Sequence, residues 1–149
     1  MRYWDTSVLL KLFVEEHNSA FFTALIEQAG AVIHTSELSR FELLRAFWGK
    51  RMEGAIRRGA EEKLMHRFES EVEKKRIILI PIGAEIRRQF EVVLKVCYIR
   101  QRPIVVRTLD ALHLASALTL KATQIVCNDT RMRAAADALQ MDVYPPRLV

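Results

Sequence analysis

The sequence predicts an α/β protein, a three-layer α/β/α sandwich with a mainly parallel central sheet. Short apolar runs alternate along the 149 residues with longer stretches of helical period, which is the pattern that βα units produce. One of these runs, Ile77–Ile80, is apolar without interruption and is stopped by Pro81, as expected of a strand buried on both faces. The length suits one domain, and we expect residues 1–149 to form it.

The elements can be assigned in chain order from this alternation. The short apolar runs predict strands over Arg2–Trp4, Ala31–His34, Ile77–Ile80, Gln124–Cys127 and Val143–Tyr144. The amphipathic stretches predict helices over Thr6–Glu15, Ser19–Ala29, Ser36–Trp48, Glu61–Lys75, Ile86–Cys97, Leu109–Leu120 and Thr130–Leu139. Between the third and fourth of these helices a turn is predicted, because glycines lie there among basic residues, at Gly49, Gly54 and Gly59.

Composition and charge exclude several classes of protein. Half of the residues are apolar, 28% are charged, and 23 Lys and Arg against 18 Asp and Glu leave a net charge of +5, which permits an anionic partner. The cysteines, Cys97 and Cys127, have neither zinc-ligand nor redox spacing, so we expect buried free thiols rather than a disulfide framework. The N-terminus lacks the pattern of a signal peptide and no apolar stretch has the length of a membrane helix. We therefore expect a cytoplasmic protein with no membrane partner.

Acidic side chains recur near the points where a predicted strand gives way to a helix. Asp5 follows the first strand, Asp129 follows the fourth, and Asp110 lies in the first turn of the sixth helix. Glu42 lies inside the third helix. Because open parallel sheets build their sites outside the carboxyl ends of the strands, these four acids are the candidate catalytic residues.

Each acid also has a purely structural interpretation. Asp5 and Asp129 can cap helices, and Glu42 can complete a capping box with Ser39. Asp110 can stabilise its helix by placing a negative charge near the positive end of the helix dipole. Taken together, the acids point to a bound cation, because clustered carboxylates raise one another's pKa unless a cation lies between them. Oxygen ligands without a matched set of His and Cys favour Mg²⁺ or Mn²⁺, which can activate water for attack on a phosphoryl group. The residues therefore predict a metal-dependent phosphodiesterase.

Four segments carry these acids, in the order Tyr3–Leu12, Ser36–Ala46, Leu109–Ala117 and Cys127–Ala136. They resemble, in the same order, the acidic motifs of PIN-domain nucleases, specifically the VapC-type ribonuclease toxins of VapBC toxin–antitoxin systems. The resemblance implies a PIN fold and Mg²⁺-dependent endoribonuclease activity on an RNA substrate. It also implies neutralisation by a cognate VapB-like antitoxin and a homodimer within a larger toxin–antitoxin complex.

The resemblance also assigns roles to residues of the motifs. It implies that Asp5 and Asp110 are direct metal ligands, that Asp129 completes the metal site, and that Glu42 ligates the metal or orients its surroundings. Supporting roles fall to three polar neighbours: Thr6 and Ser7 would hold Asp5 or a phosphate by their hydroxyls, and Asn128 would join the same rim. The chain departs from the family pattern with Cys127 in place of a common Thr and with bulky Trp4. Neither departure alters an acid, so we expect activity to be retained.

Basic residues near the acids are candidates for contacts with an RNA backbone, since phosphate contacts position a substrate without reading its sequence. They are Lys50, Arg51, Arg57 and Arg58 after the helix of Glu42, Arg100, Arg102 and Arg107 before Asp110, and Arg131 and Arg133 after Asp129. Solvated helix faces are the alternative interpretation of these charges. His113 shares a helical face with Asp110, but its apolar neighbours place it at the edge of the core rather than among metal ligands.

Two other functions stay open at this point. One is a PIN nuclease that acts in RNA processing or on DNA without an antitoxin, and the other is a non-catalytic RNA-binding or interaction module. The complete set of acids argues against the second alternative. The apolar residues of the early helices and of Phe41–Trp48 exceed what a small core needs, which predicts an antitoxin groove or a homodimer face.

Overall fold

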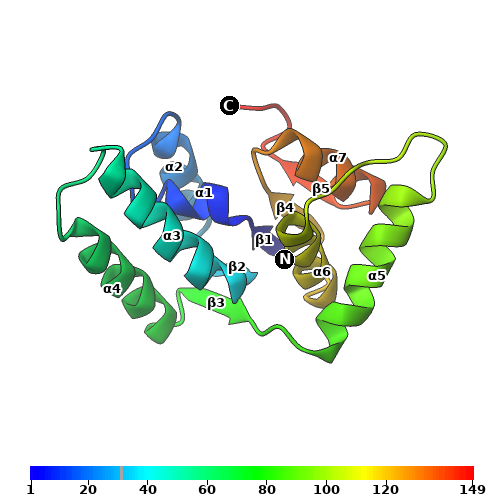
Figure 1. Ribbon diagram of the computed structural model, residues 1–149, viewed down its shortest axis with the longest axis horizontal. Helices are drawn as coiled ribbons and strands as arrows, with labels where there is room; N and C mark the ends of the chain where they lie inside the picture. Colours follow the sequence, from blue (N-terminus) through cyan, green and yellow to red (C-terminus); the bar gives the residue numbers. More distant parts are fainter. Residues whose placement is uncertain (31) are drawn as a thin grey trace.

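A five-stranded parallel sheet forms the centre of the computed structural model, which describes residues 1–30 and 32–149 (Figure 1). Its strands are β1 (Arg2–Trp4), β2 (Ile33–Ser36), β3 (Ile77–Ile80), β4 (Gln124–Val126) and β5 (Asp142–Tyr144). They lie in the order β3-β2-β1-β4-β5, and every neighbouring pair is parallel. The predicted α/β fold class is confirmed.

Helices cover both faces of this sheet (Figure 1). The first layer holds α1 (Thr6–Leu10), α2 (Ser19–Ala29), α3 (Leu38–Met52) and α4 (Ala60–Glu73). The second layer holds α5 (Ala84–Tyr98), α6 (Thr108–Thr119) and α7 (Thr130–Ala138). This division follows from right-handed crossovers, because connections that run in opposite directions along a parallel sheet lie on opposite faces.

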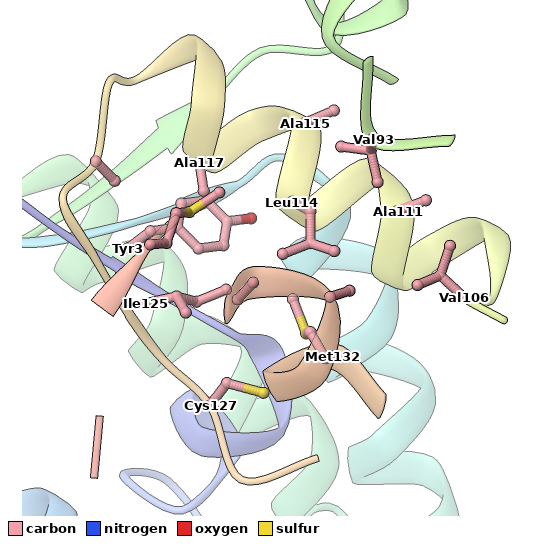
Figure 2. Close-up of a cluster of buried hydrophobic side chains, with 14 of the residues drawn as sticks. Tyr3, Val93, Val106, Ala111, Leu114, Ala115, Ala117, Ile125, Cys127 and Met132 are labelled. Carbon is pink, nitrogen blue, oxygen red and sulfur yellow. The ribbon is translucent and has the colours of Figure 1, made fainter. Parts of the chain in front are cut away.

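The central strands supply side chains to both layers by simple alternation. In β1, Tyr3 packs among α5, α6 and α7, whereas its neighbour Trp4 packs among α1, α3 and α4. Ile125 and Val126 of β4 divide in the same way. Figure 2 shows Tyr3 and Ile125 in the cluster that Leu114 of α6 joins. Trp4 is 1% exposed, so the bulky residue that departs from the family pattern is a core side chain.

The first helix is shorter than predicted. It ends at Leu10 instead of Glu15, because the chain continues in tight turns in which Leu12 N donates to Leu9 O and Phe13 N donates to Leu10 O. These turns bring the Phe13 ring edge-on against the aromatic rings of α3 and α4, with centroid distances of 6.2 and 6.0 Å. Tertiary packing of an aromatic side chain therefore overrides the local helical period.

The second strand lies two residues later than predicted, and residue 31 of the predicted strand lies outside the described residues. Thr35 and Ser36 belong to β2 and pair in register with Leu79 and Ile80. Polar residues can end a buried strand here because their hydroxyls find partners, as when Thr35 Oγ1 donates to Trp4 O at 2.8 Å. The predicted start of the next helix at Ser36 is wrong for the same reason.

The third helix starts at Leu38 and runs through Gly49 to Met52, beyond the predicted end at Trp48. Lys50 and Arg51 lie in its last turn, where positive charge interacts favourably with the helix dipole and stabilises the helix end. The turn predicted among the glycines therefore lies between Gly54 and Gly59, both of which have positive φ angles, 75° and 83°.

The sheet changes the direction of its connections between β1 and β4. From β1 the chain passes outward to β2 and β3, and then it crosses back to β4 on the other side of β1. Asp5 N donates to Val126 O at 3.0 Å, so the pairing of the two strands continues to their carboxyl ends. A crevice forms at such a switch point in open α/β sheets, and Asp5 lies at it.

Two predictions from composition can be compared with the structure. Cys97 and Cys127 are buried free thiols, as expected, and burial raises the pKa of both. Across residues 1–30 and 32–149, every helix is too short or too polar to cross a membrane.

Candidate active site

Four acids from different elements face one end of the sheet. Asp5 follows β1 as the N-cap of α1, and Asp129 is the N-cap of α7 beyond β4. Asp110 lies in the first turn of α6, and Glu42 lies in α3. The fold therefore brings the candidate residues to the β1–β4 switch point. Asp5 and Asp129 also cap helices, as the structural interpretation predicts.

Asp5 is a buried carboxylate with few partners. Its side chain is 7% exposed and accepts hydrogen bonds from Ser7 N, at 3.3 Å, and from Ser7 Oγ. Burial raises the pKa of Asp5 and the charge of Glu42 adds to that effect, although His113 and Ser7 oppose it. Positive charge placed next to Asp5 would therefore favour its ionised form.

Glu42 is held by contacts from two other elements. Thr6 Oγ1 donates to Glu42 Oε2 at 2.5 Å, and His113 Nε2 lies 2.7 Å from the same oxygen. Burial alone would raise the pKa of Glu42, but the hydrogen bond and charge of His113, with the bond from Thr6, lower it. Glu42 is therefore an ionised carboxylate in a fixed orientation.

The capping-box interpretation of Ser39 and Glu42 is wrong. The N-cap of α3 is Glu37, which makes no side-chain capping bond. Ser39 Oγ instead lies 2.8 Å from Thr6 Oγ1 and 2.7 Å from Thr35 Oγ1, so the hydroxyls form a buried chain leading to Glu42. The Ser-x-x-Glu spacing therefore serves the site rather than the helix start.

His113 is a site residue whose importance the sequence did not reveal. It is 1% exposed and lies between Glu42, on its Nε2 side, and the Tyr3 hydroxyl, 2.6 Å from Nδ1. Burial would lower the pKa of His113, but Glu42, Asp5 and Asp110 outweigh that effect and raise it. Its position three residues after Asp110 was the available signal, since that spacing places both side chains on one helical face.

Asp110 and Asp129 share one guanidinium. Arg107 Nε donates to Asp110 Oδ2 at 2.7 Å, and Arg107 Nη2 reaches Asp110 Oδ1 at 3.2 Å and Asp129 Oδ2 at 3.5 Å. Asp129 also caps α7, because its Oδ1 accepts from the backbone amides of Arg131 and Met132 at 3.0 and 2.9 Å. The site therefore contains a positive charge of its own between two of the acids.

The donor set suits a hard divalent cation. Its candidate ligands are carboxylates, which are the ligands that Mg²⁺ and Mn²⁺ accept, and a cation among them would oppose the burial that raises the pKa of Asp5. As the side chains lie, no three Asp, Glu, His or Cys residues within 1–30 and 32–149 are arranged to hold a metal ion. Arg107 occupies oxygens of Asp110, while Thr6 and His113 occupy Oε2 of Glu42, so metal binding requires these side chains to rearrange.

The supporting residues differ in what they contact. Ser7 holds Asp5, as the resemblance implies, whereas Thr6 holds Glu42 instead. Asn128 exchanges hydrogen bonds with the main chain of Val149, at 2.9 Å from Nδ2 and 3.4 Å to Oδ1. Its amide therefore anchors the last residue of the chain.

The basic candidates separate into engaged and exposed residues. Lys50 pairs with Glu16 at 2.7 Å, Arg51 pairs with Glu61 at 2.5 Å, and Arg133 binds backbone carbonyls such as Cys127 O, at 2.8 Å. These engaged cations have structural partners. The exposed side chains that lie at the two loops flanking the site helices are Arg57, Arg58, Arg100 and Arg102.

Replacing His113 with Ala is expected to destabilise the protein by about 2–4 kcal/mol, because the change leaves a cavity and removes a partner from the buried Tyr3 hydroxyl. Urea unfolding measures the loss. The matched control is His17→Ala, whose exposed side chain makes the expected change less than about 0.5 kcal/mol. Equal stability of the two variants would show that the contacts of His113 carry no weight.

The fold and the site define a class of protein, a parallel α/β sandwich that gathers carboxylates at the switch point of its sheet. The profile of the PIN domain family matches residues 2–138, and the chain belongs to this family. PIN domains are generally nucleases, and they usually use divalent metal ions. A comparison of the chain with curated proteins gives no match.

Proposed function

We propose that this chain is a Mg²⁺-dependent endoribonuclease that acts as the toxin of a toxin–antitoxin pair. One observation carries the catalytic part of the proposal. The four acids, which come from the end of β1, from α3 and from the starts of α6 and α7, lie at the switch point of the sheet. The chain that carries them belongs to a family of nucleases. A non-catalytic relative would be expected to lack at least one of them.

Asp5, Asp110 and Asp129 would hold the metal, and Glu42 would ligate it or orient the groups around it. Mg²⁺, or Mn²⁺ in its place, activates water and neutralises charge on a phosphoryl group. Ser7 keeps the Asp5 carboxylate in place, and His113 and Thr6 keep Glu42 ionised. Arg57, Arg58, Arg100 and Arg102 are exposed and would bind the RNA backbone.

The toxin–antitoxin part is supported by an apolar stripe on α3, which we call the α3 stripe. It consists of Phe41, Leu44, Trp48 and Met52, exposed by 67%, 41%, 45% and 87%. These residues recur at helical spacing on the side opposite Leu43 and Phe47, which are buried. A stripe of this kind fits an amphipathic partner helix, such as one from a VapB-like antitoxin or from a second copy in a homodimer.

The test of catalysis is the chemistry of the product ends. Purified protein is incubated with a defined RNA and Mg²⁺, and the ends are mapped. Because water is the nucleophile, the 2′-hydroxyl takes no part, so products are expected to carry 5′-phosphate and 3′-hydroxyl ends. An Asp129→Asn variant purified in the same way controls for contaminating ribonucleases. Products with 2′,3′-cyclic phosphate ends would contradict the mechanism, and cleavage of DNA alone would favour the antitoxin-independent alternative.

A further inference from the structure

Arg107 brings one positive charge to all four acids. Its guanidinium makes two contacts with Asp110, at 2.7 and 3.2 Å, and one with Asp129, at 3.5 Å. The same charge acts on Asp5 and Glu42 at longer range. Arg107 is therefore a counterion that Asp110 and Asp129 share directly.

Neither capping nor the helix dipole favours an arginine at this position. Arg107 is the N-cap of α6, where the helix dipole disfavours positive charge and where Ser, Thr, Asp or Asn would cap the free amides. Arg107 makes no such capping bond. The negative charge of Asp110 in the first turn stabilises α6 through the helix dipole, whether or not Arg107 is present. The contacts with Asp110 are an i,i+3 ion pair of α6, whereas the contact with Asp129 reaches another helix and joins the two acids through one guanidinium.

A divalent ion and this guanidinium need the same oxygens. Arg107 occupies both carboxylate oxygens of Asp110, and the acids as they lie are not arranged to hold a metal. The Arg107 side chain is 62% exposed, and exposed ion pairs are weak. An ion with two charges can therefore displace it into solvent without disturbing the core.

We propose that Arg107 is an exchangeable counterion, which offsets part of the charge of Asp110 and Asp129 before the metal binds and which the metal displaces toward the substrate phosphate. The second half of this inference rests on the proposed nuclease function. Displacement leaves the guanidinium at the mouth of the site, on the loop side of α6 that also holds Arg100 and Arg102. A planar guanidinium suits phosphate, which it binds through two parallel hydrogen bonds. Metal binding and RNA binding are then coupled through one side chain.

Metal titration without RNA tests this inference independently of catalysis. Isothermal titration with Mg²⁺ is expected to show an affinity on the order of tenfold higher for Arg107→Gln than for the wild type, because the competing charge is gone. The matched control is Arg131→Gln, which removes an equal charge two residues from Asp129 but no contact with an acid. Screening limits its expected gain to about twofold.

A second readout follows the Arg107 side chain itself. The Nε–H resonance of Arg107, assigned by its absence in the Arg107→Gln variant, is expected to shift when Mg²⁺ is added to the wild type. With saturating Mg²⁺, the variant is expected to show a raised KM for RNA. Equal Mg²⁺ affinities of the wild type and Arg107→Gln, or an unmoved resonance, would overturn the inference and leave the nuclease proposal standing. Failure of the wild type to bind Mg²⁺ would overturn both.

Discussion

Replacing Asp5 with Asn is expected to abolish RNA cleavage while leaving the protein folded. The carboxylate stands at the end of β1, beside Glu42 and at the switch point of the sheet, where the resemblance to PIN nucleases assigns a direct metal ligand. Losing this charge removes several kcal/mol of transition-state stabilisation, so the expected fall in kcat/KM is at least about a thousandfold. Initial rates of cleavage with saturating Mg²⁺ measure it.

The same substitution is expected to preserve or increase the stability of the metal-free protein. An Asn side chain can still accept the hydrogen bonds from Ser7, and it removes a charge that burial disfavours. The pKa of Asp5 is raised from 3.8 in the folded state, so ionisation of this carboxyl contributes a loss of stability as pH rises above 3.8, and the variant lacks that contribution. The stability advantage of Asp5→Asn is therefore expected to grow with rising pH, as denaturant unfolding at several pH values would show.

Loss of activity together with retained stability separates a functional acid from a structural one. Asp137→Asn is the matched control, because its exposed carboxylate lies near the end of α7, away from the site, and full activity is expected. An Asp5→Asn variant that is well folded and cleaves RNA at the wild-type rate would remove Asp5 from the site.

Charging the α3 stripe is expected to prevent neutralisation. In the Phe41→Glu/Trp48→Glu variant, two exposed aromatic residues become acids on the face that we propose for an antitoxin or a second copy. Large aromatic residues at the centre of an interface often contribute 2 kcal/mol or more each, so the Kd for the partner is expected to rise by at least about a hundredfold. Binding is measured with the small protein encoded by the neighbouring gene, and self-association by analytical ultracentrifugation.

The control for this surface lies on the opposite helical layer. Val92 of α5 is 42% exposed, and Val92→Glu adds a charge without touching the α3 stripe. Both variants are expected to keep RNA cleavage, because the substituted side chains are exposed and the hydrogen-bond partners of Glu42, Thr6 and His113, are unchanged. Unchanged partner binding and unchanged self-association of the double variant would remove the α3 stripe as an interface.

Most of the fold can be predicted from short-range patterns in the sequence. The apolar run Ile77–Ile80 forms β3 at the predicted bounds, and the helix predicted from residue 19 to residue 29 forms α2 at the predicted bounds. Such patterns succeed because periodicity reports which side of an element is buried. They fail where distant packing decides a boundary, as at Phe13, whose ring contacts end the helical run early.

The convergence of the acids could also be predicted, because parallel strands carry their carboxyl ends to one edge of a sheet. The partners of each acid could not. Thr6 follows Asp5 directly in the sequence, yet its hydroxyl bonds to Glu42, 36 residues away. No local spacing reports that contact, since it depends on how α3 packs across the start of α1.

The sequence by itself determined the α/β class, the order of the elements and the identity of four acids at one edge of the sheet. Only the tertiary structure decided how their charges are balanced. His113 joins Tyr3, 110 positions earlier, to Glu42, and Arg107 turns from the start of α6 to Asp110 and Asp129. Burial and charge compensation depend on which groups are close in space, and the spacing of residues along the chain does not determine those contacts.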